Sequence, residues 1–328
     1  AIQPTSRVLR ISTHGRGMWD YPLTDAPTIT GTVTYGNAIP AATRFVSNVL
    51  MNGAGSPPVS TTSGGLGTYS LTGFGAGSYT VTPSKTGSVN GAVSSFDAAR
   101  IAQHAAGGNP LTGNQLIVAD VSGSGTISSF DAGQVARYAA SIPGSGSSGN
   151  WIFSPVNNTY ATVTGTIAGE DYLALLMGEV SGNWVDPGAR PADVKGPGRS
   201  AVVKLPQVTA TDKDIIVPIE VQGVAKKGVI SYEFDLRYDP TVIQSLADPV
   251  DVAGTVSRGL MVVTNPYEPG FLRVIVYGPM PIDQNGVLLN LRFTAVGAPG
   301  SVSPLTFERI MFNEGEPRVT ATNGKVGL

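Results

Sequence analysis

Short runs in which apolar and polar residues alternate cover much of this 328-residue chain, and they predict β-strands. One group lies between residues 28 and 84, where glycine-rich turns separate the runs. A second group follows residue 200, with predicted strands at 202–207, 215–221, 230–238, 271–277, 287–293, 305–312 and 318–326. Each group has enough short strands to predict an antiparallel β-sandwich.

Between the two groups the period of the apolar residues changes to that of a helix. Residues 94–106 and 128–140 repeat each other at an offset of 34 positions. After the aspartate of each copy, apolar side chains fall on one helical face: Ile101 and Ala105, and Val135 and Ala139. Each copy is therefore predicted to be a loop followed by a helix.

The chain is thus predicted to be mostly β and multidomain, with two antiparallel β-sandwiches separated by a small α-helical module. Charge supports the boundaries, because Arg44 is the only charged residue from 26 to 84. A stretch rich in proline and glycine predicts a linker. The predicted parts are an N-terminal arm (1–27), a sandwich (28–84), the helical module (85–184), the linker (185–199) and a second sandwich (200–328).

Composition narrows the function. Charged residues make up 13% of the chain and the net charge is −2, so the basic surface that nucleic acids or anionic membranes require is not expected. With no cysteine and two histidines, disulfides, thiolate zinc sites and cysteine nucleophiles are excluded. No apolar run is long enough to span a membrane, and we expect a secreted or cell-surface protein without catalytic residues.

Residues 120–131 form a twelve-residue loop with the spacing of a calcium site. Oxygen-bearing side chains occupy positions 1, 3, 5, 9 and 12, Gly125 stands at the sharp turn, and a carbonyl is available at position 7. The expected ligands are Asp120, Ser122, Ser124, Thr126 and Asp131. With two carboxylates, the loop is expected to bind Ca²⁺ weakly, at about 10⁻⁴–10⁻³ M.

The equivalent loop of the first copy, 86–97, has one carboxylate, so a metal there is doubtful. Its candidate ligands are Asn90 and Asp97, with Glu179 as a donor from a segment that echoes the second loop. The alternative is that both loops are metal-free turns in which Asp97 and Asp131 cap the helices that follow.

The two loop–helix units resemble the dockerin module, which has Asp at position 12 of each loop. The run from 229 to 243, with Tyr238-Asp239-Pro240, resembles the signature strand of cohesins, and later strands of the second sandwich match as well. Alternation along the signature strand sends Tyr232, Phe234, Leu236 and Tyr238 to the core. Ser231, Glu233, Asp235 and Arg237 are expected to point outward.

The resemblance implies a contact surface on each module. On the cohesin-like side it implies Ser231, Glu233, Arg273, Ile275 and Tyr277. On the dockerin-like side it implies Ser95, Phe96, Gln103, Ser129, Phe130 and Arg137. Arg137 is expected to form a charge pair with Glu233.

Two further resemblances concern the N-terminal parts. The pattern from Gly67 to Ser84 resembles carboxypeptidase regulatory-like, prealbumin-type sandwiches. The string from Thr13 to Trp19 resembles a closing strand of BNR/sortilin-type propellers, of which one strand is present.

A chain with both a dockerin-like and a cohesin-like module is expected to be an extracellular structural subunit. Its partners would be other copies of itself, joined head to tail through these modules and the N-terminal strand, or other cohesin- or dockerin-bearing proteins. Closure of the chain on itself competes with polymerisation. The alternatives are the C-terminal tethering fragment of a propeller-type glycoside hydrolase, or a scaffold that binds a different partner.

Overall fold

The computed structural model describes residues 2–3, 8–13, 17–22, 26–39, 43–187 and 200–328. These residues form two compact units. One holds the described residues up to Ala38, those from 43 to Thr86, and Trp151–Leu175. The other holds Gly87–Asn150 and the described residues from Leu176 to Leu328. The predicted linker falls largely outside the described residues.

The N-terminal arm is a small antiparallel sheet in the order β1–β2–β3. Its strands are β1 (Ile2–Gln3), β2 (Val8–Thr13) and β3 (Gly17–Pro22). Residues 14–16 of the propeller-like string lie outside the described residues. Ile11 is 47% exposed and Met18 65%, so the sheet leaves apolar side chains in solvent.

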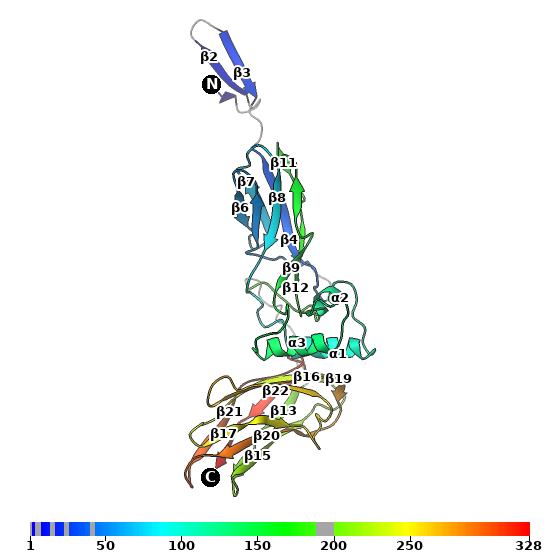
Figure 1. Cartoon of the computed structure of the whole chain (residues 1–328), viewed down its shortest axis with the longest axis vertical. Helices are drawn as coiled ribbons and strands as arrows, with labels where there is room; N and C mark the ends of the chain where they lie inside the picture. Colours follow the sequence, from blue (N-terminus) through cyan, green and yellow to red (C-terminus); the bar gives the residue numbers. More distant parts are fainter. Residues whose placement is uncertain (1, 4–7, 14–16, 23–25, 40–42, 188–199) are drawn as a thin grey trace. The chain divides into compact units, whose positions relative to one another are not determined.

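The first sandwich follows from the alternation that the sequence shows. In β4 (Thr28–Tyr35) the apolar side chains Ile29, Val33 and Tyr35 are buried while the threonines between them are partly exposed. One sheet has the order β10–β8–β5–β6. The other has the order β11–β4–β12–β9, and β7 also pairs with β4 (Figure 1). The remaining strands are β5 (Leu50–Ala54), β6 (Val59–Thr62), β7 (Thr68–Thr72), β8 (Tyr79–Ser84), β9 (Trp151–Ser154), β10 (Asn158–Tyr160), β11 (Thr166–Ile167) and β12 (Tyr172–Leu176).

Strands that follow the helical module complete this sandwich, which differs from the predicted boundaries at 84 and 184. β10 pairs with β8, while β11 and β12 pair with β4 in parallel. The helical module is thus inserted into the first sandwich. These paired residues lie 77 to 139 positions apart in the sequence. Such pairing leaves no local signal, because each strand shows the same short alternation of apolar and polar residues.

Three helices are described, namely α1 (Ser95–Ala105), α2 (Asn114–Ala119) and α3 (Ser129–Ala139). α1 packs against α3, and both begin with a reciprocal capping box. Ser94 and Ser128 are the N-caps, and their backbone N–H groups donate to the carboxylates of Asp97 and Asp131. The repeat predicted α1 and α3, whereas the short α2 has no counterpart among the predictions.

The second sandwich has its own hydrophobic core, between two sheets. Its sheets have the orders β17–β20–β15–β13–β22 and β14–β23–β21–β16–β19–β18. The strands are β13 (Ser200–Lys204), β14 (Gln207–Thr209), β15 (Asp214–Gln222), β16 (Val229–Arg237), β17 (Ile243–Asp251), β18 (Met261–Asn265), β19 (Phe271–Ile282), β20 (Gly286–Ala295), β21 (Val302–Phe312), β22 (Arg318–Thr322) and β23 (Gly324–Gly327).

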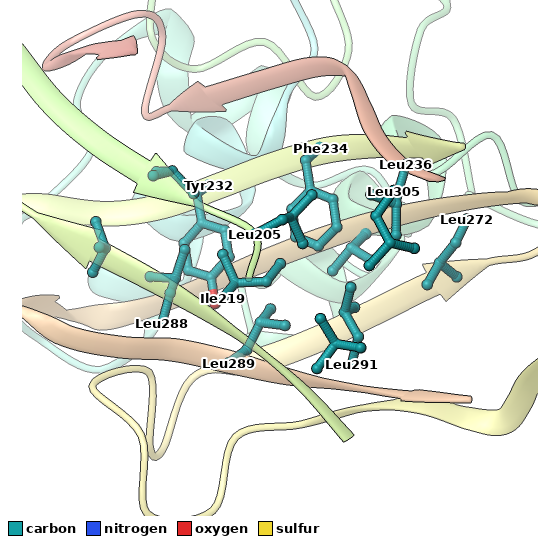
Figure 2. Packing of buried hydrophobic residues seen from close by; sticks show 14 of the residues in the cluster. Leu205, Ile219, Tyr232, Phe234, Leu236, Leu272, Leu288, Leu289, Leu291 and Leu305 are labelled. Atoms are coloured by element: carbon teal, nitrogen blue, oxygen red, sulfur yellow. The ribbon is translucent and has the colours of Figure 1, made fainter. Parts of the chain in front are cut away.

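The core confirms the alternation predicted for the signature strand. Tyr232, Phe234 and Leu236 of β16 pack in one cluster with Leu289 and Leu291 of β20, on the opposite sheet (Figure 2). The mostly β, multidomain fold is confirmed, with one difference in strand direction. β13 with β22 and β14 with β23 are parallel pairs, so the sandwich is not purely antiparallel.

Two edge strands of this sandwich, β17 and β18, are absent from the predictions. β17 contains Pro249 and the exposed polar residues Gln244 and Asp248, and no residue of β18 is fully buried. An edge strand without clear alternation can be identified only when its pairing with the neighbouring strand is known. Among the described residues, no helix has the length and apolar character needed to cross a membrane.

Gly31 tests whether the later strands are part of the first sandwich. A Cβ at Gly31 would lie 2.0 Å from the carbonyl oxygen of Glu170, just after β11. Gly31→Ala should therefore lower the free energy of unfolding by about 1–3 kcal/mol, because backbone must shift. Gly65→Ala, where a Cβ would meet nothing within 4 Å, should change it by less than about 0.5 kcal/mol. Urea unfolding measures both, and equal effects would contradict the pairing.

Candidate functional site

The face of β16 that points away from the core of the sandwich is buried. A face of this kind would be open to solvent if nothing packed on it. Ser231, Glu233 and Asp235 are all almost inaccessible, although their side chains point away from the core. The residues that cover this face belong to the helical module, because α1 packs on both β16 and β19. The second unit therefore contains an interface between the helical module and the second sandwich.

Glu233 contacts the N-terminus of α1. Its side chain is 3% exposed, and its Oε2 accepts a hydrogen bond of 3.0 Å from the backbone N–H of Ser95. Its Oε1 forms an ion pair with Arg309 on the neighbouring strand β21. The first N–H groups of a helix have no partner within the helix, and a carboxylate there is stabilised by the helix dipole.

Arg273 and Asn265 contact the other end of the helical module. Arg273 is held by two hydrogen bonds of 2.7 Å to the Asp235 carboxylate, and it donates to Ser141 Oγ over 2.8 Å. Asn265 Nδ2 donates to the Ala140 carbonyl over 2.8 Å. Ala140 and Ser141 directly follow α3, where carbonyl groups lack partners within the helix. The sandwich thus binds the start of one helix and the end of the other.

The middle of the interface is mostly apolar. Ile275 and Tyr277 on β19 are buried, and burial raises the pKa of Tyr277. A Cβ at Gly133 of α3 would lie 3.8 Å from the Tyr277 hydroxyl oxygen, so this position of α3 lies within van der Waals reach of Tyr277. Gln103 of α1 donates to the Pro279 carbonyl over 3.2 Å.

The structure brings together most residues that the sequence nominated for contact. Ser95, Gln103, Glu233 and Arg273 hydrogen-bond across the interface, as described above. Ser231, Ile275 and Tyr277 are buried on the sandwich side, and Phe96 is half-buried. In the second copy of the repeat the equivalent positions, Ser129, Phe130 and Arg137, are exposed, with Phe130 63% accessible.

The expected charge pair between Arg137 and Glu233 is not formed in the described structure. Arg137 donates to the Pro143 carbonyl of its own module, while Glu233 is occupied by Arg309 and the Ser95 N–H. The reason is that the two copies face the sandwich differently. Four further residues contribute to this interface and were not predicted from the sequence: Asn265, Pro279, Arg309 and Ser141. Their positions depend on strand register and on where α3 ends.

Hydrogen bonds within the second loop bring the oxygen atoms of its expected calcium ligands close together. Ser122 Oγ lies 3.2 Å from Asp120 Oδ1, and Ser124 Oγ lies 2.9 Å from the Thr126 carbonyl oxygen. Oxygen ligands about 2.4 Å from a Ca²⁺ ion would have similar separations. Gly125, at the sharp turn, has φ +82°. The residues present therefore fit a weak calcium site in this loop.

The two carboxylates of the second loop also organise its backbone. Asp120 accepts hydrogen bonds from the N–H groups of Ser124 and Gly125, and Asp131 accepts one from Ser122. Burial acts to raise the pKa of Asp120, but hydrogen bonds from Gly125, Ser124 and Ser122 outweigh it and lower the pKa from its usual value. In the described part of the chain, no three Asp, Glu or His side chains form a metal-binding group.

The first loop does not fit a calcium ion. Asp97 is fully buried and accepts four hydrogen bonds, two of them from the N–H groups of Val180 and Ser181. Burial, and the carboxylates of Glu314 and Glu179, raise the pKa of Asp97 well above its usual range. Asn90 donates to the Val185 carbonyl, and Glu179 accepts hydrogen bonds within its own turn.

Comparison with known families identifies both halves of the interface. Residues 201–326 match the family model of the cohesin domain, and residues 88–139 match that of the dockerin type I domain. The chain therefore carries a dockerin domain followed by a cohesin domain. Both are non-catalytic protein–protein interaction modules, and type I dockerin domains bind calcium.

Solved cohesin structures are similar to part of this chain. The sixth cohesin of scaffoldin B from Acetivibrio cellulolyticus is 24% identical, with 39% of this chain and 99% of that chain covered and a TM-score of 0.35. A non-cellulosomal cohesin from Archaeoglobus fulgidus is 21% identical, with 39% and 89% covered and a TM-score of 0.32. No curated protein matches the chain in sequence.

Glu233 is the residue whose loss should weaken docking most directly. Glu233→Ala leaves the Ser95 N–H without its acceptor and removes the partner of Arg309. Truncating one partner of a buried charged pair costs about 2 kcal/mol or more. Since 1.4 kcal/mol is about tenfold, amide exchange at the start of α1 should accelerate more than about tenfold. Hydrogen-exchange mass spectrometry of the full chain measures this.

Glu308→Ala is the matched control for Glu233→Ala. Glu308 lies on the same sandwich and pairs with Arg237, but both side chains are more than 40% exposed. Removing such a pair costs at most about 1 kcal/mol. Unchanged exchange at α1 in the Glu233 variant would show that this carboxylate does not hold the helix.

Proposed function

We propose that the dockerin and cohesin domains of this chain are a matched pair, and that the protein is an extracellular structural subunit whose copies join head to tail through them. One observation carries the proposal: hydrogen bonds from both ends of the cohesin face reach both helices of the dockerin domain of the same sequence. Complementarity at polar groups is what gives such an interface its specificity.

The same interface can form within one chain or between two. The connection from 188 to 199 has twelve residues and spans at most about 40 Å, so closure within a chain is possible. Exchange of the dockerin domain between neighbours preserves every contact, which makes it a low-cost route to assembly. Because the two surfaces differ, the contact is heterologous and can propagate from copy to copy.

The N-terminal sheet provides a second contact in this proposal. Ile11 and Met18 point to opposite faces of the sheet, since Ser12 pairs with Met18 and side chains alternate along a strand. A three-stranded sheet that exposes apolar side chains on both faces cannot bury a core of its own. Addition of its strands to a sheet edge of a neighbouring copy would cover them.

A chain without cysteine allows a direct test of assembly between copies. One preparation carries Ser141→Cys and another Asn265→Cys, positions where Asn265 Nδ2 lies 3.4 Å from the Ser141 carbonyl. After the two are unfolded and refolded together, a short bismaleimide should link chains into dimers on a denaturing gel. The link can form only between different chains, so it reports the exchanged contact.

Two controls define the outcome of the cross-linking. Ser141→Cys mixed with Ile216→Cys should give no dimer, since Ile216 is exposed on the opposite sheet. A single chain with both Ser141→Cys and Asn265→Cys reports closure within the chain. Suppose that the double variant forms a cross-link within its own chain while the mixture of single variants gives no dimer. Head-to-tail joining would then be overturned, but the proposal that the two domains recognise each other would stand.

Calcium is proposed to bind the second loop alone. Calorimetric titration of the full chain should show one site with a dissociation constant of about 10⁻⁴–10⁻³ M. Asp120→Ala should abolish it, because the loop then keeps a single carboxylate. Thr86→Ala, the equivalent position of the first loop, should leave it unchanged. Absence of heat up to tens of millimolar calcium would contradict the site.

A further inference from the structure

Four successive backbone N–H groups, from Val180 to Asn183, are divided between two buried carboxylates. Val180 and Ser181 donate to Asp97 Oδ1 over 2.9 and 3.0 Å. Gly182 and Asn183 donate to Glu179 Oε1, which also accepts from Ser181 Oγ over 2.7 Å. Consecutive N–H groups that point to one side form a concave site for negative charge.

The segment that carries these N–H groups, residues 178–185, is fixed to the dockerin domain along its length. We call it the clasp. Gly178 donates to the Val118 carbonyl over 2.8 Å, and Gln115 donates to the Val180 carbonyl over 2.7 Å. Trp184 is fully buried and donates through Nε1 to the Ser88 carbonyl of the first loop over 2.9 Å. The clasp thus connects α2 with the first loop.

The aspartates at position 12 of the two loops, Asp97 and Asp131, accept hydrogen bonds from different parts of the chain. Asp97 and Asp131 have the same place in the repeat, and each caps its own helix through Oδ2. Asp131 Oδ1 accepts an N–H from its own loop, whereas Asp97 Oδ1 accepts two from the clasp. In the first loop the lone pairs of the position-12 carboxylate are therefore used by backbone donors. Asn90 also contacts the clasp, because its Nδ2 donates to the Val185 carbonyl over 2.9 Å.

We propose that the clasp takes the role of a cation in the first loop, so that this half of the dockerin domain folds and docks without calcium. The half concerned is the one that meets the cohesin domain, because Ser95, which donates to Glu233, stands two residues before Asp97. The part of the proposal that concerns docking rests on the proposed function, while the part that concerns folding of the loop does not.

Hydrogen-exchange mass spectrometry of the full chain tests this with excess EDTA against millimolar calcium. Peptides from the first loop and the start of α1 should exchange at the same rate in both conditions. Peptides from the second loop should exchange more slowly with calcium. Calcium-dependent protection of the first loop, or two calcium ions per chain in calorimetry, would overturn the proposal.

Variants separate the clasp from the metal. Glu179→Ala removes the acceptor of Ser181, Gly182 and Asn183, and should accelerate exchange of the first loop about tenfold, which corresponds to about 1.4 kcal/mol. Glu179→Gln retains the acceptor oxygen and should restore much of the protection. Asp120→Ala, the matched change in the second loop, should leave the first loop unaffected.

These outcomes differ from those that test the proposed function. If the first loop responds to calcium while the cross-linked dimer still forms, the clasp proposal fails and the docking proposal stands. If no cross-link forms but the exchange rate of the first loop is the same with EDTA as with calcium, the docking proposal fails and the clasp proposal for folding of the loop stands. If Glu179→Ala does not fold, the comparison of EDTA with calcium in the unaltered chain still decides.

Discussion

Hydrogen bonds from backbone N–H groups to buried carboxylates organise both loops of the dockerin domain and its contact with the cohesin domain. A carboxylate removed from water needs donors, and most of those used by Asp97, Asp131, Glu179 and Glu233 are main-chain N–H groups. Glu233 adds an ion pair with Arg309. This arrangement suits a chain in which 13% of the residues are charged. Backbone N–H groups supply the hydrogen-bond donors that arginine and lysine side chains would otherwise provide.

The same interaction makes the two copies of the repeat unequal. Their sequences are closely similar from the serine pair onward, and both helices begin with the same capping box. Nevertheless, the first copy receives the clasp and lies on Glu233, while Ser129 and Phe130 of the second copy are exposed. Asp97 thus accepts hydrogen bonds from outside its own loop, whereas Asp131 accepts them from within its loop. This difference distinguishes the first copy, which docks, from the second copy, which is suited to calcium.

The clasp lies far along the chain from the first loop that it contacts. The chain leaves the first sandwich after β8, forms the helices, and returns to the sandwich from β9 to β12 before reaching residue 178. A segment that is distant in sequence from the first loop is thereby brought next to it. Trp184 shows the result, since its indole N–H bonds to a carbonyl 96 residues earlier.

The residues alone determined the mostly β architecture, α1 and α3, and the core face of β16, because each follows from a local period or cap. They also nominated both loops and most of the contact surface, through the spacing of oxygen-bearing side chains and strand alternation. Only the tertiary structure decided that β9 to β12 belong to the first sandwich, that Glu233 meets Ser95 and not Arg137, and that the clasp fills the first loop. These three features depend on contacts between residues that lie far apart in the sequence. Many short strands and backbone N–H groups have the same local sequence pattern, so only the tertiary structure shows which of them are partners.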